Sequence, residues 1–300
     1  MRKIFIIFFV LIAFSAIISC GSGNNIKPNI VWLVAEDQSQ YFFPFYGDNS
    51  VTLPNISQLL ENGIVYDGMN SPYPVCAPAR SAIITGMYPN SIGTGNMRAY
   101  HYNRTVRTDN ESILGFPYYS SKLAEQIKPF TQILRENGYY TTNNSKMDYN
   151  FKLREDAWDE SSKEASWEKR NKDQPFFSVF NFGVTHESQI WLRDKQELKV
   201  DPNGLSVPPF FPNDSLTSHA LAVNYSNLVE MDKQMGEIID KLKDQGLYEN
   251  TYIFFYSDHG GPFPRHKRAI YDTGSKVPLV IKFPKRIKVK EKRNYDLLNF

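Results

Sequence analysis

The sequence is poor in cysteine, with only two in 300 residues, at positions 20 and 76. If Cys20 is modified, as its surroundings indicate below, no disulfide can form within the chain. The charge is nearly balanced, because 34 Lys and Arg against 32 Asp and Glu leave a formal net charge of +2, which gives no strong reason to expect a nucleic-acid partner. A long membrane-spanning run is also missing, since the apolar N-terminal run, residues 4–18, is short for a span.

The N-terminus has the form of an export signal. Residues 1–3 carry two positive side chains and precede the apolar run. The run ends in Ile-Ile-Ser-Cys-Gly, which resembles a bacterial lipoprotein signal in which Cys20 becomes the lipidated first residue. We therefore expect residues 1–19 to be a signal peptide and residues 20–28 a polar tether. The protein would then be periplasmic or outer-membrane, in the bacterial cell envelope, and would contact the membrane only through its lipid. An ordinary cleaved signal or an uncleaved anchor is the alternative.

The rest of the chain is apolar enough to bury a core, with 41% hydrophobic and 14% aromatic residues. Apolar runs of strand length alternate with helical segments, which is typical of an α/β fold with a mostly parallel sheet covered by helices on both faces. Strands are expected at residues 29–35, 63–67, 139–142, 174–181, 251–257 and 276–282. Helices are expected at residues 54–61, 130–137 and 226–245, the last from apolar residues at helical spacing. Three further segments are expected on the surface: residues 157–173, 202–214 and 285–293.

The most informative stretch surrounds Cys76. Pro78 suits the first turn of a helix, so Cys76 is expected just before a helix N-terminus, where unpaired N–H groups and the helix dipole favour negative charge. Arg80, about one turn further on, adds a permanent cation that can bind an oxyanion through two N–H groups. A nucleophile beside an anion-binding site is what hydrolysis of a sulfate or phosphate ester requires. A buried structural cysteine is the simpler alternative.

The order Cys76-x-Pro78-x-Arg80, followed by Thr-Gly, resembles the signature of the sulfatase family. The resemblance implies that a formylglycine-generating enzyme oxidises Cys76 after translation and that the hydrated aldehyde is the nucleophile. It also supplies a reason for a lone remaining cysteine in an exported chain. Ala79 stands where the family commonly has serine.

Acidic residues follow two of the apolar runs. Glu36 and Asp37 follow the first run, and Asp258 and His259 follow the run at 251–257. The carboxyl ends of buried strands form the usual ligand-binding edge of an α/β sheet. The resemblance implies that these four residues, with Cys76, bind one divalent cation, which in the family is Ca²⁺. Glu36 replaces the family's aspartate and also offers carboxylate oxygens, the ligands that calcium prefers.

The resemblance assigns roles to four more side chains. Lys146 matches a lysine that holds a sulfate oxygen, and Asp148 stands where a histidine usually contacts the formylglycine. His186 matches the general acid that protonates the leaving oxygen. Lys267 lies where the heparan N-sulfatase (sulfamidase) branch has a second sulfate-binding cation. Its basic neighbours are expected to be solvated or to contact an anionic glycan: Arg265, His266 and Arg268.

Together these features imply an alkaline phosphatase-like fold in which residues 29–300 form a catalytic domain without the family's C-terminal subdomain. The expected activity is hydrolysis of sulfate esters or sulfamates on sulfated polysaccharides or glycosaminoglycan-type sugars. Two alternatives stay open: a phosphoesterase or phosphonate hydrolase on the same scaffold, and a non-catalytic glycan-binding lipoprotein. The loop-like segment 88–117 holds three basic residues that are either solvated or face an anionic substrate: His101, Arg104 and Arg107.

Overall fold

The computed structural model describes residues 27–97 and 121–300. The predicted signal peptide, the lipidation site Cys20 and the three basic residues of the loop, His101, Arg104 and Arg107, lie outside these ranges. Among the helices in the described ranges, none combines the length and the apolar character that crossing a membrane requires.

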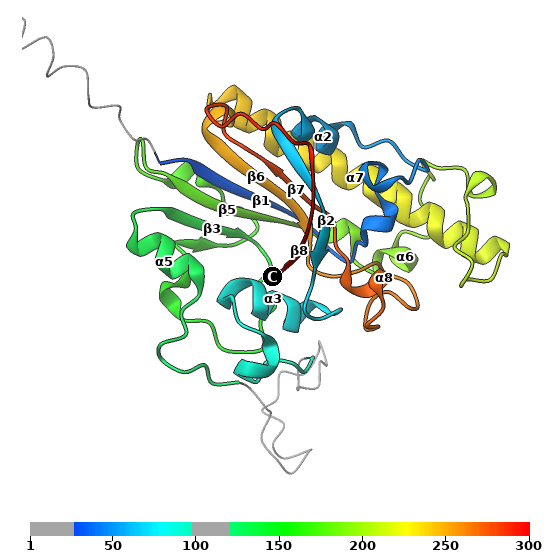
Figure 1. The fold of residues 1–300 in the computed structure, drawn as a ribbon, viewed down its shortest axis with the longest axis horizontal. Helices are drawn as coiled ribbons and strands as arrows, with labels where there is room; N and C mark the ends of the chain where they lie inside the picture. The colour runs from blue at the N-terminus through cyan, green and yellow to red at the C-terminus, as the bar shows by residue number, and fades with distance from the viewer. Residues whose placement is uncertain (1–26, 98–120) are drawn as a thin grey trace, which may run out of the picture.

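Strand β1 (Asn29–Ala35) lies in the middle of the sheet and pairs in parallel with β5 (Phe176–Phe182) and β6 (Thr251–Ser257). In the described ranges, eight strands form one sheet in the order β4-β3-β5-β1-β6-β7-β2-β8 (Figure 1). Only β7, which pairs with β6 and β2, runs antiparallel to its neighbours. The prediction of a mostly parallel α/β sheet is therefore confirmed. The other strands are β2 (Gly63–Asn70), β3 (Tyr140–Asn144), β4 (Glu160–Ser161), β7 (Leu279–Lys282) and β8 (Arg293–Asn299).

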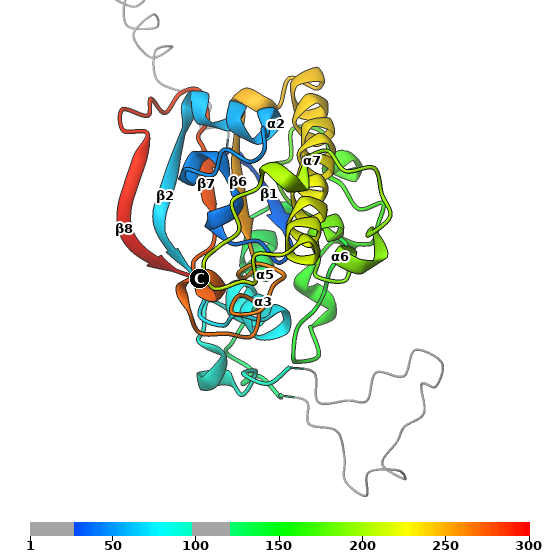
Figure 2. The same cartoon turned by 90° about the vertical axis from the view of Figure 1, so that its right-hand side faces the viewer.

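Two hydrophobic cores cover the two faces of the sheet. Val31 and Leu33 of β1 belong to the core beneath α7, whereas Val34 belongs to the core on the other face. This alternation follows from the two-residue period of a strand, which sends successive side chains to opposite faces. Figure 2 shows α7 running along one side of the sheet.

The helices and turns connect the strands. The α-helices are α2 (Pro54–Ser57), α3 (Cys76–Thr85), α5 (Phe130–Glu136), α6 (Gln189–Leu192), α7 (Ser215–Asp244) and α8 (Asp272–Ser275). The 3₁₀ turns are η1 (Gln40–Phe42), η2 (Pro44–Tyr46), η3 (Gln58–Asn62), η4 (Pro89–Ile92), η5 (Glu155–Ala157), η6 (Trp167–Lys169), η7 (Gly183–Thr185), η8 (Pro202–Gly204) and η9 (Tyr248–Asn250). The helix predicted at 54–61 is thus an α-helical turn that continues as a 3₁₀ turn.

Helix α7 is longer than predicted. The apolar pattern indicated a start near residue 226, but the helix begins at Ser215. The Asp214 side chain accepts a hydrogen bond from the Thr217 backbone N–H at 2.8 Å, which caps the helix start. Before residue 226, only Ser215 and Leu216 of the helix are exposed, whereas Leu221 and Val223 are buried, so the apolar pattern could have been followed further toward the helix start.

One surface assignment needs correction, and one strand was not predicted. Trp167 lies in the segment predicted to be a surface connection, yet it is fully buried and stacks on Phe176 with the ring centroids 5.3 Å apart. The chain after the exposed basic segment also forms a strand, β8, parallel to β2. Its polar and apolar residues do not alternate clearly, so no strand pattern is visible in this segment.

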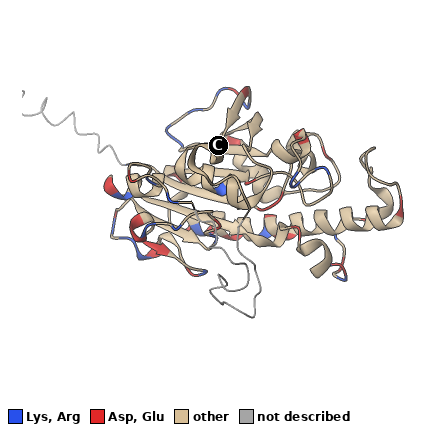
Figure 3. Cartoon of the chain, turned by 90° about the horizontal axis from the view of Figure 1, so that it is seen from below, with Lys and Arg blue, Asp and Glu red and all other residues tan. Residues whose placement is uncertain are grey.

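Charged residues of both signs are interspersed in the view of Figure 3, on loops, turns and helix surfaces. This distribution agrees with a chain whose net charge is only +2.

Candidate active site

The sheet topology brings the two predicted acidic segments together. Because β1 and β6 are parallel neighbours and Ala35 pairs with Ser257, the residues that follow these strands meet at one edge. The backbone N–H of Asp37 donates a hydrogen bond to Asp258 Oδ1 at 3.2 Å. Asp37 has a positive φ of 54°, a left-handed conformation that aspartate tolerates better than most residues.

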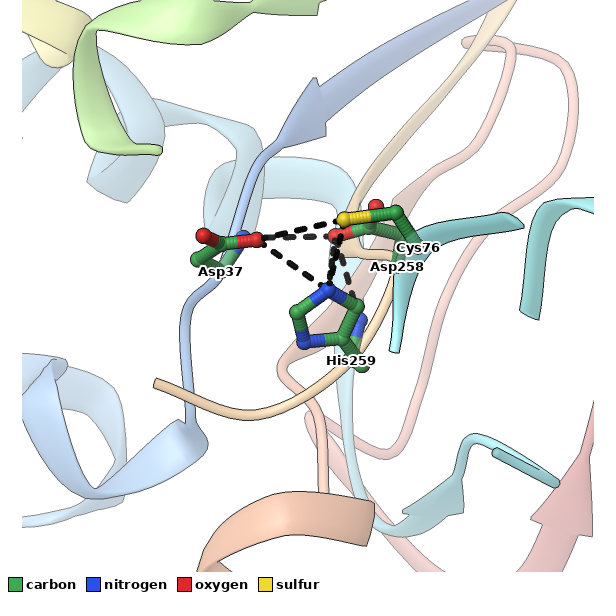
Figure 4. Close-up of side chains that lie close together, drawn as sticks. All are labelled: Asp37, Cys76, Asp258 and His259. Atoms are coloured by element: carbon green, nitrogen blue, oxygen red, sulfur yellow. Dashed lines mark hydrogen bonds and ion pairs between the residues drawn. The ribbon is translucent and has the colours of Figure 1, made fainter. Parts of the chain in front are cut away.

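Four buried side chains converge at this edge: Asp37, Cys76, Asp258 and His259 (Figure 4). One ligand atom of each lies within 4.8 Å of the others. The Cys76 sulfur is 3.2 Å from His259 Nε2, which in turn is 3.1 Å from Asp37 Oδ1. Cys76 is the first residue of α3 rather than the residue before it, so it belongs to the first turn, as the anion-site prediction requires.

The chemistry of this group fits a divalent cation. It offers two carboxylates, one imidazole and the side chain at position 76. His259 Nδ1 lies 2.9 Å from the Gly260 carbonyl oxygen, so Nδ1 carries a proton and Nε2 is free to act as a ligand. Glu36, the fifth predicted ligand, lies outside this group of four, and its metal role stays a prediction.

Arg80 is buried and contacts residues at the ends of two strands. Its Nε donates to Asp258 Oδ2 at 2.9 Å, and its Nη1 donates to Asn181 Oδ1 at 2.7 Å. The third nitrogen, Nη2, makes no hydrogen bond to a described residue, and the nearest acid, Glu36, is 3.7 Å away. Burial lowers the pKa of Arg80, but the carboxylates of Asp258 and Glu36 outweigh this effect and raise the pKa above its ordinary value. The guanidinium therefore remains charged. The N–H groups of Nη2 are therefore available to an anion.

Lys146 occupies the opposite side of Glu36. Its Nζ lies 2.6 Å from Glu36 Oε2 and 3.9 Å from Asp148 Oδ2. Glu36 thus sits between two of the predicted sulfate-binding cations, Lys146 and Arg80. Among the predicted site residues, Asp148 contacts Lys146 through this longer ion pair. Its catalytic role stays a prediction.

Lys267 and His186 complete the ring of charged groups. Lys267 Nζ is 2.7 Å from Asp37 Oδ2 and 3.3 Å from His186 Nε2. Burial lowers the pKa of Lys267, but the charge of Asp37 outweighs this effect and raises it. The other ring nitrogen of His186, Nδ1, lies 2.9 Å from Ser188 Oγ, so Nε2 is the nitrogen that faces the site.

The acid–base groups of the site perturb one another. Burial raises the pKa of Asp37, but the charges of His259 and Lys267 hold it well below its ordinary value. Burial also raises the pKa of the Cys76 thiol, but hydrogen bonds to His186 and His259 bring it down to about 7. A substantial fraction of the thiol is therefore ionised near neutral pH, which is typical of a functional rather than an inert cysteine.

Two further residues, Asn181 and Glu187, shape the site and were missed by sequence reasoning. Asn181 accepts the Arg80 hydrogen bond, and it is the polar residue near the end of the apolar strand β5, a signal that could have been noticed. Glu187 pairs with Arg268 at 2.5 Å and lies 3.5 Å from Lys267. Sequence could not indicate this pairing, because the two partners are 81 positions apart.

Comparisons with known proteins agree with this geometry. A family profile described as Sulfatase matches residues 28–300. The chain is 40% identical over 310 residues to an ulvan-active sulfatase of Formosa agariphila, covering 91% of this chain and 50% of that protein. It is 24% identical over 307 residues to the human N-acetylgalactosamine-6-sulfatase, covering 88% of this chain and 58% of that protein. The chain thus spans about half the length of the curated relatives it matches.

Solved structures share the fold. The phosphonate monoester hydrolase of Agrobacterium radiobacter superposes with a TM-score of 0.66 at 15% identity, over 91% of this chain and 71% of that one. A 2-O GAG sulfatase superposes with a TM-score of 0.65 at 16% identity, over 91% of this chain and 68% of the other.

Proposed function

Because this chain belongs to the sulfatase family, we propose that the protein hydrolyses sulfate esters or sulfamates on a sulfated polysaccharide or glycosaminoglycan-type sugar. The observation that carries the proposal is the position of Cys76: its sulfur lies 3.2 Å from His259, in the first turn of α3 and beside three buried or half-buried cations. The 40% identity to an ulvan-active sulfatase supports a polysaccharide as the substrate.

Three cations are placed to bind the sulfate group. Arg80, Lys146 and Lys267 lie around the cluster that contains Cys76 and are paired with Asp258, Glu36 and Asp37, respectively. A bound sulfate would accept hydrogen bonds from these cations. These bonds would replace some of the present contacts between the cations and the carboxylates. Such preorganised donors lower the free energy of the transition state, where charge accumulates on the oxygens of sulfur.

His186 is the proposed general acid. Burial lowers its pKa, but contact with Cys76 and the charge of Asp37 raise it above its ordinary value, which favours the protonated imidazole that a general acid needs. As the bond between sulfur and the leaving oxygen breaks, Nε2 gives that oxygen its proton. We propose a supporting role for Asp148, which would orient Lys146.

Two groups that the family uses fit the residues present. We propose that Cys76 is converted to formylglycine, which supplies a hydrated aldehyde as nucleophile. We also propose that Asp37, Asp258, His259 and the side chain at position 76 hold a calcium ion, with Glu36 close by; the ion would supply Lewis acidity and orient the nucleophile.

The proposal extends to the maturation and location of the protein. A formylglycine-generating enzyme would be its first partner, and a lipid on Cys20 would hold it in the bacterial envelope. Radiolabelled palmitate incorporation, lost in a Cys20→Ala variant, would support the lipid anchor; unchanged labelling would contradict it.

Two measurements test the proposed activity. Mass spectrometry of the peptide that contains Cys76, from the full-length protein made in its native host, should show an aldehyde in place of the thiol. An alkylatable thiol there would favour the glycan-binding alternative. Turnover of an aryl sulfate should exceed turnover of the matching aryl phosphate; the reverse order would favour a phosphoesterase, because the same cations can bind a phosphate.

A further inference from the structure

The candidate metal site includes one sulfur donor. As long as Cys76 has not been oxidised, the four side chains Asp37, Cys76, Asp258 and His259 offer one sulfur, one nitrogen and two carboxylate oxygens (Figure 4). Calcium takes about six to eight oxygen ligands, of which this group supplies two. The unoxidised chain therefore presents a donor set that suits a different cation from the one proposed for the oxidised chain.

The spacing of the donor atoms fits a metal with four ligands. With bonds of about 2.3 Å to sulfur and about 2.0–2.1 Å to nitrogen or oxygen, the ligand atoms of a tetrahedral zinc site lie about 3.3–3.6 Å apart. The Cys76 sulfur lies 3.2 Å from His259 Nε2 and 3.8 Å from Asp37 Oδ1. His259 Nε2 lies 3.1 Å from Asp37 Oδ1 and 3.9 Å from Asp258 Oδ1. The observed separations lie on both sides of the tetrahedral values, so small side-chain shifts admit a four-coordinate ion.

Other residues hold each ligand so that one of its atoms faces the group. A backbone carbonyl oxygen accepts the Nδ1 proton of His259, which leaves Nε2 as the donor atom. Asp37 Oδ2 lies 2.7 Å from Lys267 Nζ, and Asp258 Oδ2 accepts a hydrogen bond from Arg80 Nε at 2.9 Å. Each carboxylate therefore has its Oδ1 on the side of the group, as a single-oxygen ligand requires. Such outer partners are typical of protein metal sites.

The four ligands are buried. Cys76 is 2% exposed, and Asp37, Asp258 and His259 are each 0% exposed. Four protein ligands are the arrangement of structural zinc sites, whereas catalytic zinc sites have three and keep one position for water. Thiolate and imidazole are also the ligands that favour zinc over calcium or magnesium. The spacing alone suits several metals, and the donor atoms decide between them.

From these contacts we propose that the chain with unoxidised Cys76 binds one Zn²⁺ through the sulfur, His259 Nε2 and the Oδ1 atoms of Asp37 and Asp258. Binding forms a zinc–sulfur bond and releases the thiol proton to solvent. The inference rests on the proposed function only where it concerns oxidation: the hydrated aldehyde replaces sulfur with oxygen, which shifts the preference of the same centre from zinc to calcium. A chain that folds before Cys76 is oxidised is then held in a zinc-bound form.

Cobalt(II) is the probe for this site, because it occupies zinc sites and its bond to a thiolate produces a strong absorption band in the near ultraviolet. The full-length protein is made in a host without the oxidising enzyme and carries Cys20→Ala, so that Cys76 is its only cysteine. About one equivalent of Co²⁺ should produce the band, and about one equivalent of Zn²⁺ should abolish it. The band should persist in an approximately 100-fold excess of Ca²⁺.

Two variants and one control assign the band to the group. Cys76→Ser places oxygen where the sulfur was and should lose the band, and Asp258→Asn should weaken Co²⁺ binding about tenfold or more. Asp240→Asn changes an exposed acid outside the group and should bind Co²⁺ like the parent protein. Circular dichroism checks that each variant is folded.

A parent protein without the band, a band that survives in Cys76→Ser, or a band that excess Ca²⁺ removes would overturn the proposal. Protein in which mass spectrometry detects the aldehyde should give no band and should bind Ca²⁺ more tightly than Zn²⁺; the same preference in both forms would overturn the switch. None of these measurements uses sulfate turnover. Failure of the oxidised protein to hydrolyse an aryl sulfate would therefore count against the proposed function alone.

Discussion

Arg80 combines a structural and a chemical role in one buried side chain. It neutralises Asp258, donates a hydrogen bond to Asn181 and leaves the N–H groups of Nη2 for an anion. The structural role can be measured as a loss of stability. Removal of one partner from a buried ion pair leaves the other charge uncompensated and lowers the free energy of unfolding.

We therefore predict that Arg80→Gln lowers the free energy of unfolding of the metal-free protein by about 3 kcal/mol, measured by urea denaturation. Arg80→Lys keeps the charge but loses the paired N–H geometry, so it should cost less stability while still reducing sulfate turnover. Unchanged stability in Arg80→Gln would show that Asp258 is not buried as a charged group.

The His266 imidazole gives the stability of the protein a pH dependence. Burial lowers its pKa to about 4, whereas the pKa of an unfolded histidine is about 6.5. Between these values the unfolded chain binds the proton and the folded chain does not, so stability falls as the pH drops through this window.

His266→Phe keeps an aromatic ring and removes the titration. The free energy of unfolding of the wild type should fall by about 2–3 kcal/mol more than that of His266→Phe between pH 7 and pH 4. Chemical denaturation across this pH range measures the difference between the two proteins, in which the contributions of other titrating groups cancel. Parallel pH profiles would contradict the prediction.

At the scale of elements, the contact of α2 with α7 depends on one carboxylate. Asp232 of α7 accepts hydrogen bonds from the backbone N–H groups of Asn55 and Ile56, at 3.1 and 2.8 Å, at the start of α2. It also accepts one from the Asn55 side chain at 2.9 Å. The close approach needs Gly236, since a Cβ there would lie 2.6 Å from the Asn55 side chain.

Asp232→Ala should lower the free energy of unfolding by about 3 kcal/mol, because a buried backbone donor, Ile56, and a part-buried one, Asn55, lose their acceptor. Asp232→Asn retains one acceptor oxygen and should cost clearly less. Urea denaturation of both variants provides the comparison, and equal losses in the two would indicate a packing effect instead of a loss of hydrogen bonds.

The strands could be predicted where both faces are buried. The runs 29–35 and 251–257 coincide with β1 and β6, because a strand covered on both sides is apolar throughout. Edge strand β8 was missed because its residues are mostly exposed and show no continuous apolar pattern. The start of α7 was placed too late, because its first turn is exposed and is fixed by the Asp214 cap.

The site was predictable to the extent that its residues follow strands. Asp37, Asp258 and His259 could be grouped because parallel strands end at one edge of the sheet. Cys76 and Arg80 could be grouped because they lie about one helix turn apart. The partners of Glu36 and Glu187 could not be foreseen. Which cation faces which acid depends on the register of β1 against its neighbours and on the paths of the loops.

At the scale of the whole molecule, the candidate metal site should couple to stability. Asp37, Cys76, Asp258 and His259 come from three separate segments, so they form a ligand group only in the folded state. A ligand that binds the folded state alone stabilises it by mass action.

Calcium at about 100 times its dissociation constant should therefore add about 2.7 kcal/mol to the free energy of unfolding, and a chelator should remove this gain. Thermal unfolding of the full-length protein with calcium or with chelator measures the effect. Asp258→Asn should abolish the calcium response, whereas Asp240→Asn, on the exposed side of α7, should keep it. A wild-type melting temperature that is indifferent to calcium and to magnesium would contradict the site.

The burial of Cys76 has a consequence for the timing of biosynthesis. Its side chain is 2% exposed in the folded chain, and the centre around it joins residues as far apart as Asp37 and Lys267, 230 positions from each other. On the ribosome, the last of these residues emerges long after the first, so the thiol stays accessible throughout most of translation. Any enzyme that oxidises it must act before the chain folds, because folding buries the thiol.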